Sequence, residues 1–199
     1  MQWKDLFDGK TLGKWKSIQF GGEGEVVVKD DMIVMPMGAS MTGVAYTGEL
    51  PRDNYEIELE GQRLDGIDFF ATTTFPVGKD RCSFVTGGWG GTVIGLSCID
   101  FYDAADNSTS AFFDFKDKTW YRFRIRVSEA KIEVWVNDKR VVNQARKGHK
   151  ISIRDECDLC KPLGICTWDT TGAVRKIRIR DLTPEEIKTA ADAAKEEEF

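Results

Sequence analysis

The stretch Tyr55-Glu56-Ile57-Glu58-Leu59-Glu60-Gly61-Gln62 alternates between apolar and acidic side chains up to Glu60. Successive side chains of an extended strand point to opposite faces, so this period of two predicts a half-buried antiparallel strand with one glutamate face. Residues 120–127 repeat the pattern with arginine on the polar face, and residues 176–180 repeat it with lysine and arginine. The chain therefore contains one acidic strand and two basic strands.

Opposite charges on neighbouring strands attract, and each pair contributes about 0.2–1 kcal/mol. We therefore expect the acidic strand to lie beside one or both basic strands, with the charges paired across one outer face. The alternative, an arginine surface that binds anions or nucleic acid, is disfavoured because the 33 acidic residues outnumber the 28 basic ones and give a net charge of −5.

The remainder of the chain consists of short β-rich runs separated by turn signals. Residues 25–28 and 32–35 predict a hairpin, Asn137-Asp138 a tight turn, and residues 150–153 and 163–168 further strands. Ten to thirteen strands without an internal helix predict an all-β antiparallel sandwich or jelly roll over residues 1–182.

The segment 183–199 differs from the rest of the chain in being helical. Thr183 is a good N-cap, Pro184 suits the first helical position, and Glu186 completes a capping box. We expect this segment to be a helical appendage or a linker to another domain.

Composition bounds the class of protein. The chain has 199 residues, of which 41% are hydrophobic, which suits one domain with a sizeable core. It has no apolar run long enough for a transmembrane helix and no signal-peptide pattern at its start, so we expect no membrane partner. As it stands it reads as cytoplasmic, or as periplasmic or secreted if a signal peptide has been removed.

Five cysteines are present, and Cys157 and Cys160 form a single C-x-x-C pair. Structural zinc needs four ligands, usually Cys or His. Cys166 would be a third ligand and Asp155, Glu156 or Asp158 a fourth. We favour ordinary thiols or a local disulfide over this metal site.

A glycine-rich stretch, residues 86–100, places Trp89 between two glycine pairs and ends at Asp100. Glycine lets the backbone pass close to a ligand or adopt positive φ. We expect Trp89 either to stack on a ligand or to close the end of the core. The glycines do not open a helix in the expected fold, so the stretch is not a phosphate-binding loop.

Four motifs carry a resemblance to a known family: Leu6-Phe7-Asp8-Gly9-Lys10-Thr11-Leu12-Gly13-Lys14-Trp15, Trp120-Tyr121-Arg122, Val134-Trp135-Val136-Asn137-Asp138, and Val174-Arg175-Lys176-Ile177-Arg178-Ile179-Arg180-Asp181-Leu182. Together they resemble the 3-keto-disaccharide hydrolase domain family, formerly a domain of unknown function, over residues 3–182. The resemblance implies a concanavalin A-like lectin/glucanase jelly roll with ligand on its concave sheet. It also implies cleavage of glycosidic bonds in sugars oxidised at C3.

The chain departs from the family pattern in two places. Asp68 stands where members carry small polar residues, and residues 164–168 lack an expected histidine. The only histidine, His149, lies in a basic loop. The chain therefore resembles a divergent member.

The candidate catalytic residues are Asp68, Asp100 and Arg81. Asp68 is a lone acid on its strand, which disfavours a laminarinase-like mechanism with several acids on one strand. It could still pair with Asp100 or Asp103 from a neighbouring strand, as the two carboxylates of a glycosidase do. A C3 ketone acidifies the neighbouring C–H, so keto-sugar cleavage needs a base, Asp68 or Asp100, and an enolate stabiliser, Arg81.

Two further sets of candidates concern binding. Aromatic rings pack on sugar faces, and the candidates are Trp89, Trp168, Tyr102 and Phe70. Ca²⁺ takes six to eight oxygen ligands, and the candidates are Asp100, Asp103, Asp106 and Asn107; the default reading of these four is a solvated loop.

Three interpretations of function remain. The first is a carbohydrate-active enzyme that cleaves glycosides or keto-glycosides, the second a non-catalytic glycan-binding module, and the third an interaction domain of a larger protein. An enzyme should bring Asp68 and another acid or an arginine into one cleft, whereas a lectin should present a shallow aromatic face.

Overall fold

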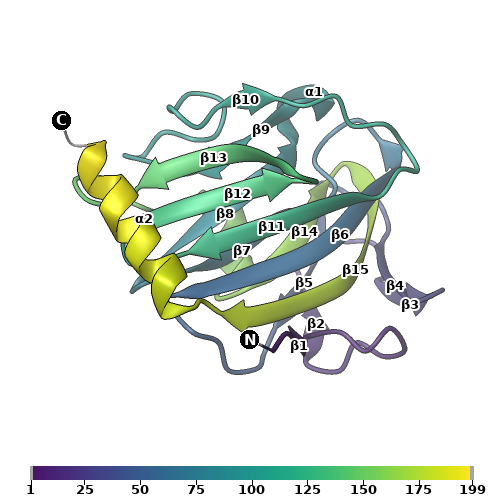
Figure 1. Ribbon diagram of the computed structural model, residues 1–199. Helices are drawn as coiled ribbons and strands as arrows, with labels where there is room; N and C mark the ends of the chain where they lie inside the picture. Colours follow the sequence, from purple (N-terminus) through teal and green to yellow (C-terminus); the bar gives the residue numbers. More distant parts are fainter. Residues whose placement is uncertain (1, 198–199) are drawn as a thin grey trace.

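The computed structural model describes residues 2–197 and consists of two antiparallel sheets packed face to face (Figure 1). Sheet A has the order β13-β12-β11-β6-β15-β4-β3, with β1 paired to β15. Its strands are β1 Lys4–Asp5, β3 Val27–Lys29, β4 Met32–Met35, β6 Tyr55–Gly66, β11 Tyr121–Val127, β12 Lys131–Val136, β13 Lys139–Ala145 and β15 Thr170–Asp181.

Sheet B has the order β10-β9-β8-β7-β14-β5-β2. Its strands are β2 Trp15–Ser17, β5 Met41–Tyr46, β7 Thr72–Val77, β8 Asp80–Gly87, β9 Val93–Ser97, β10 Ala111–Phe112 and β14 Gly164–Trp168. Every strand pair in both sheets is antiparallel, which confirms the predicted all-β sandwich.

The core lies between the sheets and is built from the inward residues of alternating strands. Ile57 and Leu59 of β6 and Phe123 of β11 face Phe75 and Phe84 of sheet B, and all five are buried. Burying such a side chain stabilises the fold by about 1.5–3 kcal/mol.

The predicted charge pairing is confirmed on the outer face of sheet A. The acidic strand β6 lies between the basic strands β11 and β15. Glu56 is opposite Arg126 and Arg180, and Glu58 is opposite Arg124 and Arg178. The alternation of charge therefore predicted the neighbours of β6, and the observed register sets opposite charges across from one another.

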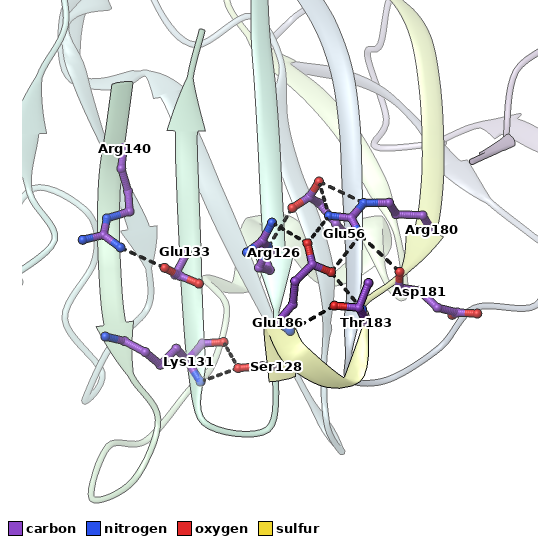
Figure 2. Close-up of polar contacts among 10 residues, drawn as sticks. All are labelled: Glu56, Arg126, Ser128, Lys131, Glu133, Arg140, Arg180, Asp181, Thr183 and Glu186. Carbon is purple, nitrogen blue, oxygen red and sulfur yellow. Dashed lines mark hydrogen bonds and ion pairs between the residues drawn. The ribbon is translucent and has the colours of Figure 1, made fainter. Parts of the chain in front are cut away.

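Helix α2, Pro184–Glu196, runs across sheet A at one end of its strands (Figure 1). The predicted capping box is present, since Thr183 and Glu186 exchange hydrogen bonds of 2.8 and 3.0 Å. Glu186 also reaches the sheet, where it pairs with Arg126 at 3.2 Å and Arg180 at 2.8 Å (Figure 2). The part of the predicted appendage that the structure describes, residues 183–197, is thus packed on the sandwich; residues 198–199 lie outside the described residues.

Two sequence expectations about local structure were wrong. Residues 150–153 form no strand; Ile151 makes an isolated bridge to Ile99. The sandwich also contains two short helical turns, α1 Gly88–Gly91 and the 3₁₀ helix η1 Asp155–Cys160. Both are too short to carry an amphipathic pattern, so periodicity could not reveal them.

Candidate functional site

The outer face of sheet B carries a pocket of about 220 Å³. Its floor consists of outward side chains of β5, β7, β8, β9 and β14, namely Met41, Thr72, Ser83, Val85, Ser97 and Trp168. Three connections form its walls: the β6–β7 link with Asp68 and Phe69, α1 with Trp89, and the region of η1 with Arg154, Glu156 and Cys157. The pocket therefore joins segments that are far apart in the sequence.

Two of the predicted aromatic residues, Trp89 and Trp168, line this pocket. Trp89 is 46% exposed and has φ 49°, in the left-handed region that non-glycine residues rarely adopt. Trp168 packs against Phe69, with their ring centroids 6.4 Å apart. A ligand in the pocket would meet aromatic surface from two directions, which suits the apolar face of a sugar.

Asp68 also lines the pocket, and its carboxylate organises the surrounding backbone. Oδ1 accepts a hydrogen bond from the N–H of Phe69 at 2.8 Å, and Oδ2 accepts one from the N–H of Gly90 at 3.0 Å. These bonds link the β6–β7 connection to α1. Asp68 is half-buried, so its carboxylate combines a fixed orientation with access to the pocket.

A cation that the sequence analysis did not single out, Arg154, also lines the pocket. It is paired with Glu156 at 2.8 Å and with Asp103 at 2.6 Å, and its guanidinium lies 5.6 Å from the centroid of the Trp89 ring. The Arg154 hydrogen bond lowers the pKa of Glu156, which keeps that carboxyl ionised. The pocket thus holds two carboxylates and one guanidinium.

The other predicted catalytic residues, Asp100 and Arg81, lie outside the lining of this pocket. Asp100 has φ 52° and pairs with His149 at 2.7 Å, and the hydrogen bond from His149 lowers the pKa of Asp100. Arg81 donates to the carbonyl of Asp80 at 2.7 Å. The structure therefore does not bring Asp68, Asp100 and Arg81 into one cleft.

The remaining predicted aromatic residues also lie away from the pocket lining. Tyr102 is 61% exposed, and Phe70 is fully buried in an edge-to-face contact with Phe115. Phe69, the neighbour of Phe70, lines the pocket instead.

Three of the four residues considered for calcium have side chains engaged with protein groups. Asp100 pairs with His149, and Asp103 with Arg154. The side-chain oxygen of Asn107 accepts hydrogen bonds from the backbone and hydroxyl of Thr109 at 2.9 and 2.6 Å. Among residues 2–197, no group of three or more His, Cys, Asp or Glu that could hold a metal forms around Asp100, Asp103 and Asp106.

A cysteine cluster lies beside the pocket. Cys157, Cys160 and Cys166 are all buried, and their sulfur atoms lie within 4.8 Å of one another. Hydrogen bonds among the three thiols lower the pKa of Cys157 and raise that of Cys160 and Cys166. The structure brings Cys166 to the C-x-x-C pair, and all five cysteines of the chain are free thiols.

The sequence signals for Arg154, Glu156 and Phe69 were weak. Arg154 and Glu156 lie in a charged loop that resembles any solvated turn, and only the docking of η1 on sheet B carries them to the pocket. The C-x-x-C pair inside that loop was the one local hint that it packs against the protein.

The fold recurs in solved structures of carbohydrate-active proteins. The carbohydrate-binding module CBM66 from Bacillus subtilis has a TM-score of 0.55 and 9% identity, with 84% of this chain and 96% of that chain covered. A putative glycosyl hydrolase from Parabacteroides distasonis has a TM-score of 0.54 and 13% identity, with 91% and 94% covered. A prokaryotic β-1,3-1,4-glucanase (lichenase) from a mouse hindgut metagenome has a TM-score of 0.60 and 7% identity, with 92% and 100% covered.

These identities establish a shared jelly-roll fold. No curated protein sequence matches the chain significantly. In the described part of the chain, no helix has the length and apolar character needed to cross a membrane. The family model of the 3-keto-alpha-glucoside-1,2-lyase-like domain matches residues 2–180, which is nearly the whole sandwich. The chain belongs to this family.

Proposed function

We propose that the pocket on sheet B binds a sugar oxidised at C3 and that the protein cleaves its glycosidic bond. One observation carries this proposal: Asp68 and Arg154 line the same pocket as the aromatic residues Trp89 and Trp168. A sugar needs aromatic surface for its C–H face and a few polar groups for orientation. The keto-glycoside assignment is supported by membership of the family.

The proposed chemistry is an elimination that starts at C2. The C3 ketone acidifies the C2–H bond, and Asp68 removes that proton. The electron pair forms an enolate, which Arg154 stabilises by its positive charge. When the ketone re-forms, the pair moves to make a C1=C2 bond and the C1–O bond breaks. The leaving oxygen takes a proton, which yields an alcohol and an unsaturated keto-sugar.

A second candidate, a non-catalytic glycan-binding module, is favoured by one observation. Both carboxylates of the pocket are engaged: Asp68 accepts two backbone N–H groups, and Glu156 is paired with Arg154. Such groups orient a ligand without moving a proton. The two candidates therefore predict the same binding site and differ only in turnover.

The discriminating experiment compares p-nitrophenyl 3-keto-glucoside with p-nitrophenyl glucoside and follows nitrophenol release. We expect release from the keto substrate alone, slower release when C2 carries deuterium, and a fall in kcat/KM of about 100- to 10,000-fold for Asp68→Asn. Asp114→Asn is the matched control, because Asp114 is exposed and pairs only with Lys116 among the described ion pairs.

Other outcomes would change the proposal. Saturable binding without turnover would identify a glycan-binding module. If Asp68→Asn kept full activity and Asp100→Asn lost it, the catalytic base would be Asp100, which pairs with His149. An unchanged circular dichroism spectrum of each variant keeps these outcomes separate from misfolding.

A further inference from the structure

The cluster of Cys157, Cys160 and Cys166 has the arrangement of a metal site. Cys157 and Cys160 lie three residues apart in η1, and side chains at that spacing fall on the same side of a 3₁₀ helix. Cys166 comes from β14 and points to the same outer face of sheet B as Trp168 and Thr72. Two separate segments thus direct three thiols at one point.

The spacing of the sulfur atoms suits a tetrahedral ion. Thiolates about 2.3 Å from a tetrahedral zinc lie about 3.8 Å from one another. The three sulfur atoms lie within 4.8 Å of each other, so small side-chain rotations would complete the arrangement. A disulfide, by contrast, would use two of the thiols and leave the third buried beside it.

The backbone is built to bring these segments together. A Cβ on Gly164 would lie 2.5 Å from the carbonyl oxygen of Cys160, and a Cβ on Gly43 would lie 2.9 Å from the Cβ of Cys166. Both contacts are closer than real Cβ atoms allow, so Gly164 of β14 permits the approach of η1, and Gly43 of β5 permits the approach of Cys166 on β14. The apolar residues Ile18 and Met41 then pack around the thiols.

The cluster is open on one side only. Cys157 lines the pocket, whereas Cys160 and Cys166 are fully buried beneath it. The two acids that flank Cys157 are turned to cations: Glu156 pairs with Arg154 at 2.8 Å, and Asp158 pairs with Lys161 at 2.5 Å. A fourth coordination position would therefore face the pocket, as in zinc sites that keep one position for water or substrate.

We propose that Cys157, Cys160 and Cys166 bind one Zn²⁺ ion, whose fourth coordination position opens into the pocket on sheet B. Binding displaces the thiol protons to solvent and leaves three thiolate ligands. The open position takes water or an oxygen atom of the bound sugar, and this last assignment rests on the proposed function. The metal site itself does not.

The test uses the full chain, purified under reducing conditions and freed of metal with a chelator. Adding Co²⁺ as a spectroscopic probe should produce thiolate-to-cobalt charge-transfer absorption and intense d–d bands, saturating at about one equivalent. Cys160→Ser and Cys166→Ser should weaken binding by about 100-fold or more. Cys82→Ala is the matched control, because Cys82 is buried in the core between the sheets. Glu156→Gln should keep the spectrum, because Glu156 is paired with Arg154 and is not one of the ligands.

Imidazole then probes the fourth position. A shift of the d–d bands on adding imidazole supports an open position, and unchanged bands would contradict it. Wild-type protein that shows no charge-transfer absorption, or that binds Co²⁺ as tightly after Cys166→Ser, would overturn the site. If the protein did not bind a keto-sugar, the cobalt and imidazole results would still stand. Failure of the proposed function can therefore be distinguished from failure of the zinc site.

Discussion

The outer faces of the two sheets differ in where their charged residues lie. On sheet A, the glutamates of β6 are neutralised by the arginines of β11 and β15, and α2 adds Glu186 to the same network (Figure 2). On sheet B, the strand residues that form the pocket floor are uncharged, and the connections around them supply the charges of the pocket. The charged residues on the strands of sheet A pair with one another and stabilise the sheet. The charged residues of the pocket on sheet B come instead from the connections between strands.

The largest effect should follow the loss of the most buried charge of sheet A. Glu56 has 1% of its side chain exposed and pairs with Arg126 at 2.7 Å and Arg180 at 3.2 Å. Glu56→Gln should lower the free energy of unfolding by about 3 kcal/mol, because it leaves two arginines with one shared acid. Urea unfolding measures this change.

A matched exposed pair provides the control for Glu56. Lys188 and Asp192 lie on the solvent side of α2 and form a 2.9 Å ion pair. Asp192→Asn should change the free energy of unfolding by less than about 0.5 kcal/mol. Equal losses for the two variants would contradict the view that burial gives the network on sheet A its strength.

The next largest effect should fall on sheet B, where glycine sets the distance between loop and sheet. Gly164→Ala would place a Cβ 2.5 Å from the Cys160 carbonyl oxygen and force η1 outward. We expect a loss of about 2 kcal/mol in the free energy of unfolding and faster reaction of Cys157 with a thiol reagent. Unchanged stability and thiol reactivity would show that η1 is not held by this contact.

A smaller effect concerns pH and the helix on sheet A. The hydrogen bond from Arg180 lowers the pKa of Glu186 to about 2. An unfolded chain has a glutamate pKa of about 4.3, so the stabilisation is fully present above that pH and is lost as the pH falls towards 2.

Glu186→Gln isolates this charge, because glutamine also serves in a capping box. Near pH 6 the wild type should exceed the variant in free energy of unfolding by about 1 kcal/mol, after allowance for solvent screening. The difference should shrink between pH 5 and pH 2. A difference that is constant over this range would exclude the Glu186 charge as its source.

The sequence predicted sheet A better than the pocket, for a physical reason. Alternation along β6, β11 and β15 is a local property, and pairing of opposite charges adds the register. The capping box of α2 is local as well, and both expectations are confirmed.

The pocket depends on contacts that are distant in sequence. Asp68 was named through the family resemblance, and Trp89 and Trp168 as aromatic side chains suited to a sugar face. Arg154 and Glu156 reach them only because η1 docks on sheet B. The positive φ of Asp100 and the inward turn of Phe70 are set by tertiary packing, which no short pattern encodes.

The most direct test of the pocket uses the six tryptophans of the chain as reporters. Trp89 and Trp168 line the pocket on sheet B, whereas the rings of Trp3, Trp120 and Trp135 lie against arginines of sheet A. In a titration of the slow Asp68→Asn variant with p-nitrophenyl 3-keto-glucoside followed by ¹H–¹⁵N NMR of the indole N–H groups, the resonances of Trp89 and Trp168 should shift. Shifts confined to Trp3, Trp120 or Trp135 would contradict the assignment of the sugar site to sheet B.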